Sequence, residues 1–489
     1  MLTPFLPALR PCLAPMGRRS RLGHTVQTLR HYTLDQVGEL FRRFVPEPLV
    51  AATSSGEHSR ARDYPLGFTL QCFVWQRLTP STSCRAVVKA VHVLRCLLGL
   101  APVDDDTSAY CQARAALPQE RLEQIVAATA HKARQRLPHA TGRLNGRPVK
   151  VVDGSSTQLP DTAANQKEYP QPTNQRRGCG FPVMKLAVLF CLASGAVLAA
   201  AFGNLHGHDL RIWQPLWEGL LQGDILLGDR AYGEFTTLAA LPKRGVDVIA
   251  RLHQRRKADY RKAKRLGKQD GLFVWQRPRQ PSDLLSAAEW ALLPEHITVR
   301  VICFVAQTRG FRAQRLRVVT TLLDPQTYRA EAIIATYLRR WRLELCLRDL
   351  KTTLGMERLS CQSPALARKE VLAYLIAHNL IRCVMAAAVR AHDVDLERVS
   401  FKGTVDAVRV YCVAIARANN PRQRQALWND LLRGLAEDAV PCRPGREEPR
   451  ATKRRPKPYP YLTKPRRQYR EIPHRNRYCK SKRAQRNSR

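Results

Sequence analysis

Acidic residues are scarce in this chain, so their positions point to a chemistry based on carboxylates. Asp153 ends the apolar run "VKVVD" before Gly-Ser-Ser, and Asp229 follows the apolar run "ILLG". Glu344 lies within "YLRRWRLELCLRDLKTTLGMERL", residues 337–359, with an arginine four residues away on each side. Carboxylate oxygens without histidine or cysteine suit hard divalent cations such as Mg2+ or Mn2+. Three such groups brought together would hold ions that act on a phosphodiester.

Residues 337–359 are predicted to form one helix with a charged stripe where an apolar one is usual. At about 100° per residue, this stripe is bordered by leucines and carries Tyr337, Arg340, Glu344, Arg348 and Lys351. The simpler interpretation is a solvated face, on which Arg340 and Arg348 make i,i+4 ion pairs with Glu344 worth a few tenths of a kcal/mol. The alternative is that Glu344 ligates a metal ion among cations that hold phosphates. This helix alone does not decide between the two.

Each aspartate also has a simpler structural role. An aspartate before glycine commonly accepts backbone N–H bonds in a turn, which fits Asp153. Asp229 is followed by Arg230, with which it could form a local ion pair. In an open α/β sheet, however, ligands gather beyond the carboxyl ends of the strands. Two carboxylates at such ends, with Glu344 on a helix beside the sheet, would converge on one point.

The overall charge indicates a polyanionic partner. The 489 residues include 81 Lys and Arg against 40 Asp and Glu, which gives a formal net charge of +41. Nucleic acid is the first candidate, because no basic amphipathic helix with a clean apolar face indicates a membrane surface. The 14 cysteines include no C-x-x-C pair, which argues against a disulfide scaffold and a zinc site and favours the reducing cytoplasm.

The chain divides by pattern into regions of different composition. Residues 1–145 are predicted to be helical and basic, and strands alternate with helices from 149 to 250. The apolar stretch 181–204 is long enough to span a membrane, but Lys185 and the Ser-Gly pair inside it favour two buried strands of a hairpin. Residues 251–324 are β-like and rich in loops. Helices follow to about residue 440, and the Pro/Arg/Lys-rich residues 441–489 are predicted to be disordered.

Four of the helix residues also carry a family signature. Tyr337, Arg340, Glu344 and Lys351 reproduce the pattern Y-(2)-R-(3)-E-(6)-K. The chain therefore resembles the IS4-family bacterial insertion-sequence transposases, which are DDE enzymes related to Tn5 transposase. "VVDGSSTQLPD" is similar to the first-aspartate motif of that family and "GDRAYG" to the second. The resemblance covers about residues 148–360.

The resemblance implies a fold and a domain organisation. The fold is α/β, with an RNase H-like catalytic core at 146–360 that contains a mainly β insertion at 251–324. A helical N-terminal DNA-binding region at 1–145 precedes the core. A helical C-terminal region at 361–440 and the basic tail at 441–489 follow it.

The same resemblance implies an activity and its site residues. The chain is expected to cut DNA at the ends of an insertion sequence and to join those ends to target DNA. Asp153, Asp229 and Glu344 would hold two Mg2+ or Mn2+ ions, while Tyr337, Arg340 and Lys351 would contact phosphates near the cut end.

The expected partners are double-stranded DNA, both terminal inverted repeats and target, and a second copy of the chain in a homodimer on DNA. No membrane partner is expected, and the location is the bacterial cytoplasm, associated with the nucleoid. Two alternatives remain, a purely hydrolytic metal-dependent nuclease on the same fold and a nucleic-acid-binding protein without catalysis.

Overall fold

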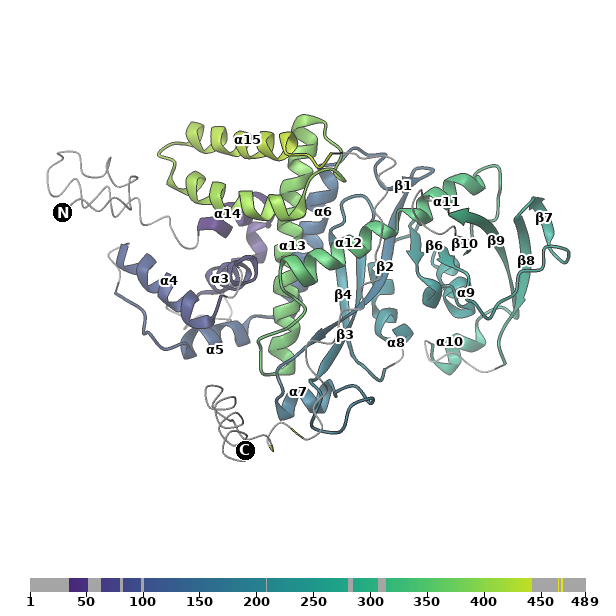
Figure 1. The fold of residues 1–489 in the computed structure, drawn as a ribbon, viewed down its shortest axis with the longest axis horizontal. Helices are drawn as coiled ribbons and strands as arrows, with labels where there is room; N and C mark the ends of the chain where they lie inside the picture. The colour runs from purple at the N-terminus through teal and green to yellow at the C-terminus, as the bar shows by residue number, and fades with distance from the viewer. Residues whose placement is uncertain are drawn as a thin grey trace, which may run out of the picture.

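One large sheet and a body of helices make up the fold. The computed structural model describes residues 35–51, 63–79, 82–97, 101–207, 209–279, 285–306 and 314–441, with 465 and 468. Within these residues, ten strands form a sheet in the order β4-β3-β2-β5-β6-β10-β9-β8-β7, with β1 paired to β2 beside this path. Figure 1 shows the helical body on one side of the molecule and the outer strands β8 and β7 at the opposite end.

The strands span Arg143–Leu144 (β1), Arg147–Gln158 (β2), Val183–Cys191 (β3), Val197–Asn204 (β4), Ile225–Gly228 (β5), Asp247–Arg251 (β6), Lys264–Gly267 (β7), Asp270–Gln276 (β8), His296–Ala306 (β9) and Gln314–Thr320 (β10). The α-helices are Asp35–Phe44 (α2), Leu66–Leu78 (α3), Cys84–Leu97 (α4), Ser108–Ala116 (α5), Gln119–Gln135 (α6), Ala163–Glu168 (α7), Asp209–Trp213 (α8), Phe235–Lys243 (α9), Ala287–Ala291 (α10), Ala330–Leu338 (α11), Trp341–Arg348 (α12), Pro364–His392 (α13), Phe401–Arg417 (α14) and Pro421–Glu437 (α15). Shorter 3-10 helices cover Glu47–Leu49 (η3), Gln214–Gly219 (η4) and Arg230–Tyr232 (η5), and Asp349–Thr353 (η6) is a π-helix.

The half of the sheet nearest the helical body mixes two pairing directions. Strands β2, β3 and β4 pair antiparallel, whereas β2, β5 and β6 are parallel. The hairpin predicted within 181–204 is confirmed as β3 and β4, and the turn between them places Gly195 at φ +66°, in the left-handed region that favours glycine. Buried side chains on both faces of β3 explain why this stretch reads as an almost continuous apolar run.

The turn expected directly after Asp153 is absent, which corrects the sequence analysis. β2 continues to Gln158, because β3 pairs with it from Lys150 opposite Cys191 to Gln158 opposite Val183. The backbone groups of the Gly-Ser-Ser segment are thereby satisfied by a distant part of the chain. Asp153 lies within a strand rather than at its end.

Residues 251–324 extend this sheet rather than forming a separate one. β7, β8, β9 and β10 pair antiparallel in sequence, and β10 also pairs antiparallel with β6. The ion pair between Arg300 and Asp270, at 2.5 Å and largely buried, joins β9 to β8. The outer strands are thus continuous with the strands that carry the aspartates.

Helix α13 is the centre of the helical body. It contacts α6, α3, α14 and α15, and its neighbours from both ends of the chain share one hydrophobic core with it. Among the described residues, α13 alone is long and apolar enough to cross a membrane, and its apolar window is completely buried by these neighbours. A second core fills the other face of the sheet, around Trp213, Trp217 and Phe235.

Asn379 joins α13 to the sheet through a fully buried amide. Its Nδ2 donates to the carbonyl oxygens of Val197, at 2.8 Å, and Val126, at 2.9 Å. Its Oδ1 accepts from the backbone N–H of Val197 at 2.8 Å. The side chain therefore pairs with the first residue of β4 much as a neighbouring strand would, and it also ties α6 to this junction.

We expect Asn379→Leu to lower the free energy of unfolding by about 3 kcal/mol, because it keeps the volume but leaves the buried N–H and C=O of Val197 without partners. Urea unfolding measures the change. Asn429→Leu, on the exposed side of α15, is the matched control and should change stability by less than about 0.5 kcal/mol. Equal effects of the two variants would contradict this role of Asn379.

Candidate active site

The register of two parallel strands brings the aspartates together. The last parallel pair between β2 and β5 is Val151 with Leu227. Asp153 and Asp229 each lie two residues beyond that pair, and Asp229 keeps an extended backbone, with φ −73° and ψ −178°. Side chains two residues apart lie on the same face of a strand, so both carboxylates emerge on one face of neighbouring strands.

The charged helix is not the single helix that was expected over 337–359. α11 ends at Leu338 and α12 begins at Trp341. Between them the backbone tightens, since the N–H of Leu343 donates to Arg340 O at 2.9 Å, three residues back. Beyond α12 it widens into η6, where the N–H of Leu354 donates to Asp349 O five residues back. A tight turn followed by a wide one changes which side chains face the sheet.

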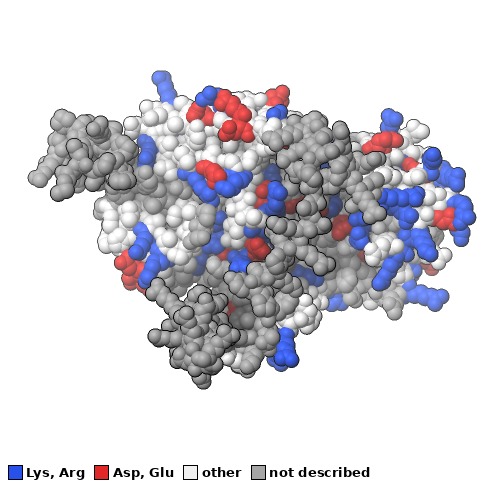
Figure 2. Space-filling model, viewed as in Figure 1, with Lys and Arg blue, Asp and Glu red and all other residues white. Residues whose placement is uncertain are grey.

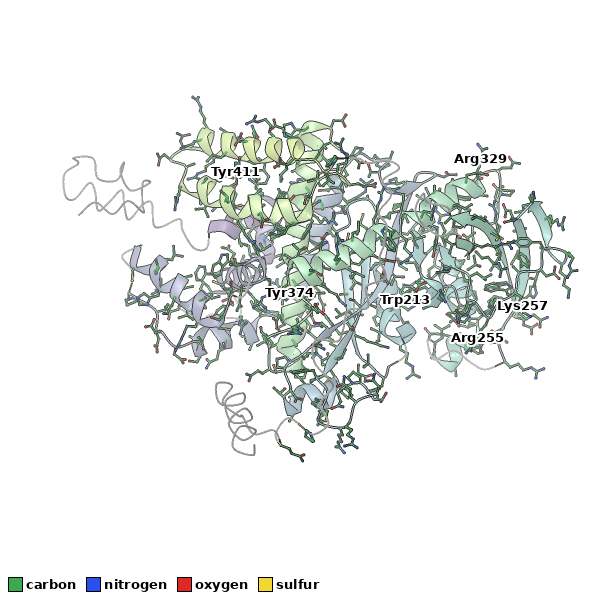
Figure 3. The ribbon with its side chains drawn as sticks, viewed as in Figure 1. Trp213, Arg255, Lys257, Arg329, Tyr374 and Tyr411 are labelled. Atoms are coloured by element: carbon green, nitrogen blue, oxygen red, sulfur yellow. The ribbon has the colours of Figure 1, made fainter. Side chains whose placement is uncertain are left out.

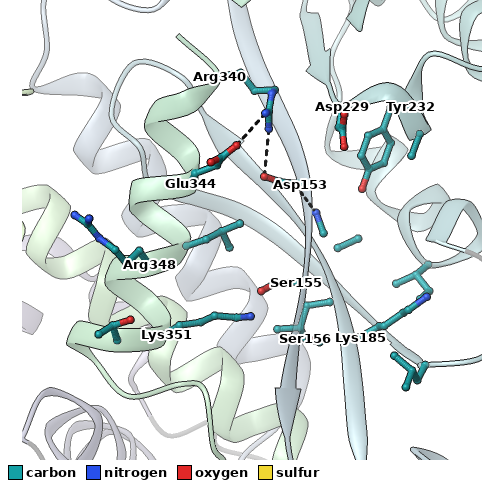
Figure 4. Close-up of a pocket in the computed structure, with 18 residues that line it drawn as sticks. Asp153, Ser155, Ser156, Lys185, Asp229, Tyr232, Arg340, Glu344, Arg348 and Lys351 are labelled. Carbon is teal, nitrogen blue, oxygen red and sulfur yellow. Dashed lines mark hydrogen bonds and ion pairs between the residues drawn. The ribbon is translucent and has the colours of Figure 1, made fainter. Parts of the chain in front are cut away.

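The guanidinium of Arg340 lies between carboxylates from the sheet and the helix. Its Nη2 donates to Glu344 Oε1 at 3.0 Å, and its Nη1 is 3.6 Å from Asp153 Oδ2 (Figure 4). Burial disfavours the charged guanidinium, but Tyr337 and the carboxylates outweigh that effect, so the pKa of Arg340 is raised. Arg340 therefore stays charged and joins the two elements.

Asp153 feels the charges of both other carboxylates. Burial is the largest effect and raises its pKa, and the negative charges of Asp229 and Glu344 raise it further. The Gly154 N–H and the charge of Arg340 act in the opposite direction without cancelling these effects. A raised pKa with these causes is a physical sign that the three carboxylates share one site.

The three carboxylates line one cavity of about 790 Å³. Figure 4 shows Asp153 and Asp229 on the sheet side of it and Glu344 on the helix opposite. Arg340 and Lys351 also line it, and within the described residues no hydrogen bond or ion pair holds the ammonium of Lys351. The cavity thus combines clustered carboxylates with a free cation.

The remaining predicted contact residue, Tyr337, does not line this cavity. It is buried, its phenol lies against Arg340, and burial raises its pKa. Asp349, which follows α12 directly, lines a different cavity, where its Oδ2 is 3.7 Å from Arg382 Nη2. These placements follow from the change of helical geometry around α12.

Both aspartates also make the local backbone hydrogen bonds that were considered as their simpler structural role. Asp153 accepts the Gly154 N–H at 2.8 Å, and Asp229 accepts the backbone N–H of Arg230. The side chain of Arg230 instead donates to Gln254 at 2.6 Å, so the local ion pair considered for Asp229 is not formed. Local hydrogen bonds fix the carboxylates while leaving oxygens directed at the cavity.

The donor set suits a hard divalent cation, although the carboxylates are not yet gathered around one. In the described part of the chain, no three His, Cys, Asp or Glu side chains are close enough to hold a metal ion. The positive charge between Asp153 and Glu344 is that of Arg340. Three carboxylates that line one cavity beside this guanidinium are a donor set that suits a hard divalent cation.

Sequence reasoning missed Lys185 as a site residue. It lies on β3, lines the same cavity, and donates to Gly207 O at 3.2 Å. The signal was present, because it is the one charged residue in an otherwise apolar strand. Its position depends on the antiparallel pairing that places Ser156 of β2 opposite it.

Comparison with known proteins finds a matching family, a relative by sequence and a structural neighbour. The family described as "Transposase DDE domain" matches residues 144–380. Transposase InsG for insertion sequence element IS4, from Escherichia coli strain K12, is 26% identical over 408 residues, which cover 83% of this chain and 89% of the relative. A cryo-EM structure of the piggyBac transposase synaptic complex with hairpin DNA can be superimposed on 88% of this chain and 87% of the piggyBac chain. The TM-score is 0.37 and the sequence identity is 7%, so this likeness carries no argument.

We expect Asp153→Asn to raise the free energy of unfolding near neutral pH when no divalent ion is present. The pKa of Asp153 is raised in the folded state, so its ionised form destabilises the fold above that pKa and not below its ordinary value near 3.8. The gain should therefore grow as the pH rises, as measured by urea unfolding between pH 4 and 7. Asp438→Asn, an exposed carboxylate after α15, is the control. A gain independent of pH would contradict the prediction.

Proposed function

We propose that the chain is a DDE transposase of the IS4 family, and that it moves an insertion sequence by cutting DNA at the ends of the element and joining them to target DNA. The observation that carries the proposal is the cavity lined by Asp153, Asp229 and Glu344. These residues are the carboxylates of the two aspartate motifs and of the Y-(2)-R-(3)-E-(6)-K signature.

We propose that the sheet around this cavity is an RNase H-like core. The order β4-β3-β2-β5-β6 supports this, because three antiparallel strands precede two that run parallel to the first. The first aspartate lies on the first of these strands, and the second directly follows the fourth. This connectivity explains how residues 76 positions apart in the chain reach the same cavity.

The carboxylates of Asp153, Asp229 and Glu344 would hold two Mg2+ or Mn2+ ions. Such ions, when bound, supply an activated oxygen nucleophile and stabilise the leaving oxygen of a phosphodiester. The raised pKa of Asp153 supports this role, since a cation would offset the repulsion from Asp229 and Glu344. The chain itself orients the carboxylates through the backbone N–H groups of Gly154 and Arg230.

Arg340 and Lys351 would hold DNA phosphates beside the carboxylates. Lys351 lines the cavity and pairs with no described residue, so its ammonium is available to a phosphate. In the metal-free chain Arg340 supplies the positive charge between Asp153 and Glu344. We infer that it turns from these carboxylates to a phosphate as ions and DNA bind. The phenol of Tyr337 would hold Arg340 in position. The family signature implies that Tyr337 also contacts a phosphate of the same DNA strand.

DNA binding is proposed to be shared among several regions. Residues 1–145 would read the terminal repeats, the core would occupy 146–360, and 361–440 would support pairing of two copies on DNA in the bacterial nucleoid. Figure 2 shows Lys and Arg gathered at the end of the molecule formed by the outer strands, where the exposed ones include Arg255, Lys257, Lys262, Lys264 and Arg265. These would add salt-dependent phosphate affinity. The basic tail at 441–489 lies outside the described residues, apart from 441, 465 and 468.

A strand-transfer assay tests the proposal against its alternatives. The assay supplies precut duplex ends that carry the inverted repeat flanking the open reading frame, a labelled target duplex and Mn2+. Joined product supports a transposase. Cleavage of uncut ends without joining would indicate a hydrolytic nuclease, and a mobility shift without chemistry would indicate a DNA-binding protein.

We expect Asp153→Ala, Asp229→Ala and Glu344→Gln each to lower cleavage and joining by about 10³-fold or more, because each removes a ligand that the others cannot replace. DNA binding measured in the absence of divalent ions should be retained. Mn2+ should raise the thermal midpoint of the wild-type chain and not that of the variants. A variant that keeps its activity would exclude its residue from the metal site.

Lys351→Ala is expected to weaken binding to precut ends and to lower the slope of log K against log salt by about 0.9, the value for one lost phosphate contact. Fluorescence anisotropy over a salt series measures both quantities. Lys243→Ala, at the exposed end of α9, removes the same charge elsewhere and is the control. Wild-type affinity and slope in the Lys351 variant would refute its contact with phosphate.

A further inference from the structure

A second cavity lies beside the first, on the other side of η6. It has a volume of about 440 Å³ and forms where the end of α3, the start of α4 and residues 352–360 meet α13 and α14. Thr352 lines both cavities, and Lys351 and Thr353 on either side of it line one each. The two cavities are therefore neighbours along a single turn of the chain.

The lining of this second cavity is rich in hydrogen-bond donors and poor in negative charge. Its charged side chains are the arginines Arg77, Arg358 and Arg409, and no Asp or Glu lines it among the described residues. Hydroxyl groups surround them, from Thr79, Thr352, Thr353 and others. Guanidinium and hydroxyl groups around an acid-free hollow are the groups that proteins use to bind phosphate.

The three arginines differ in how firmly they are held. Arg77 is 6% exposed and pairs with the fully buried Glu370 at 2.5 Å, yet its Nε has no hydrogen-bond partner in the described structure. Arg409 donates from Nε to Leu78 O at 3.0 Å and pairs with Asp406 at 3.1 Å. Arg358 is exposed and makes no ion pair or side-chain hydrogen bond with any described residue.

Buried donors without partners strengthen the case for a ligand. Besides Arg77 Nε, the buried hydroxyl of Thr79 has no partner within the described residues. A buried polar group left unpaired costs about 1 to 3 kcal/mol, so an anion that accepts hydrogen bonds from such groups is favoured. The site thus has two guanidinium groups that are held in place, those of Arg77 and Arg409, and a third, that of Arg358, that pairs with no described residue.

We propose that this cavity binds a backbone phosphate of the same DNA strand that occupies the active-site cavity. The inference rests on the proposed function and deepens it, by assigning a second phosphate position outside the carboxylate site. Continuity is the argument for DNA rather than a free anion, because Thr352 joins the two cavities and Lys351 precedes it. The strand would be gripped on one side by η6 and on the other by α3 and α14.

This site would position the DNA rather than take part in the chemistry. One bound DNA strand would connect helices of the N-terminal and C-terminal regions to η6, which directly follows the helix that carries Glu344. A strand held there is fixed in register relative to the carboxylates, so a scissile phosphate can be presented to them.

Arg358→Gln is the first test, since the side chain of Arg358 has no partner in the described part of the chain whose loss would disturb folding. Binding of the full chain to precut ends should weaken by about tenfold, and the salt slope should fall by about 0.9. Arg358→Lys, which keeps the charge, should restore the slope. Arg329→Gln is the matched control, because Arg329 is exposed and lies far from Tyr374 of this cavity in Figure 3.

Single methylphosphonate linkages, which remove one phosphate charge at a time, identify the phosphate. One position near the cut should weaken wild-type binding and have little further effect on the Arg358→Gln variant. The inference is overturned if Arg358→Gln keeps the wild-type salt slope of binding. It is also overturned if a methylphosphonate at every position weakens binding of the variant as much as binding of the wild type. Failure of the wild-type chain to join ends would instead overturn the proposed function, so the two failures are distinguishable.

Discussion

Like charges gather in a half-buried cavity only when a cation joins them, and the guanidinium of Arg340 is that cation in this chain. It bridges Asp153 on the sheet and Glu344 on the helix, while burial, and after it the repulsion from Asp229 and Glu344, raises the pKa of Asp153. The cavity is therefore held together by an interaction that a metal ion can replace. The same interaction joins the helix to the sheet. The arrangement of the three carboxylates, and with it their ability to bind a ligand, therefore depends on the side chain of Arg340.

The rest of the structure supplies the stiffness that this arrangement needs. The parallel register of β2 and β5 fixes the two aspartates, and the antiparallel partner β3 fixes β2 over its whole length. On the helical side, Asn379 and Glu370 anchor α13 through buried hydrogen bonds and an ion pair. Glu370 also accepts the N–H groups of Ser360 and Cys361, so the chain that follows η6 is held by the same helix.

Local sequence was sufficient to predict features that depend on nearby residues. The apolar runs before Asp153 and Asp229 predicted strands, and the hairpin within 181–204 followed from its interruptions. Features that depend on distant partners were not predictable in this way. β2 continues past Asp153 because β3 satisfies its backbone, and the helix over 337–359 is divided because tight and wide turns carry no clear local signal. The arginine-lined cavity combines residues from five elements, so no single stretch reveals it.

The burial of α13 has a consequence for how the chain is made. Its 29 residues would satisfy the length and composition of a membrane span if they emerged alone from the ribosome. Its partners α3, α6 and β4 are encoded upstream, so they are already synthesised when α13 appears. The apolar surface can be covered during translation, and α14 and α15 complete the cover immediately afterwards. The order of the elements along the chain thus allows the apolar surface of α13 to be buried before it can aggregate or enter a membrane.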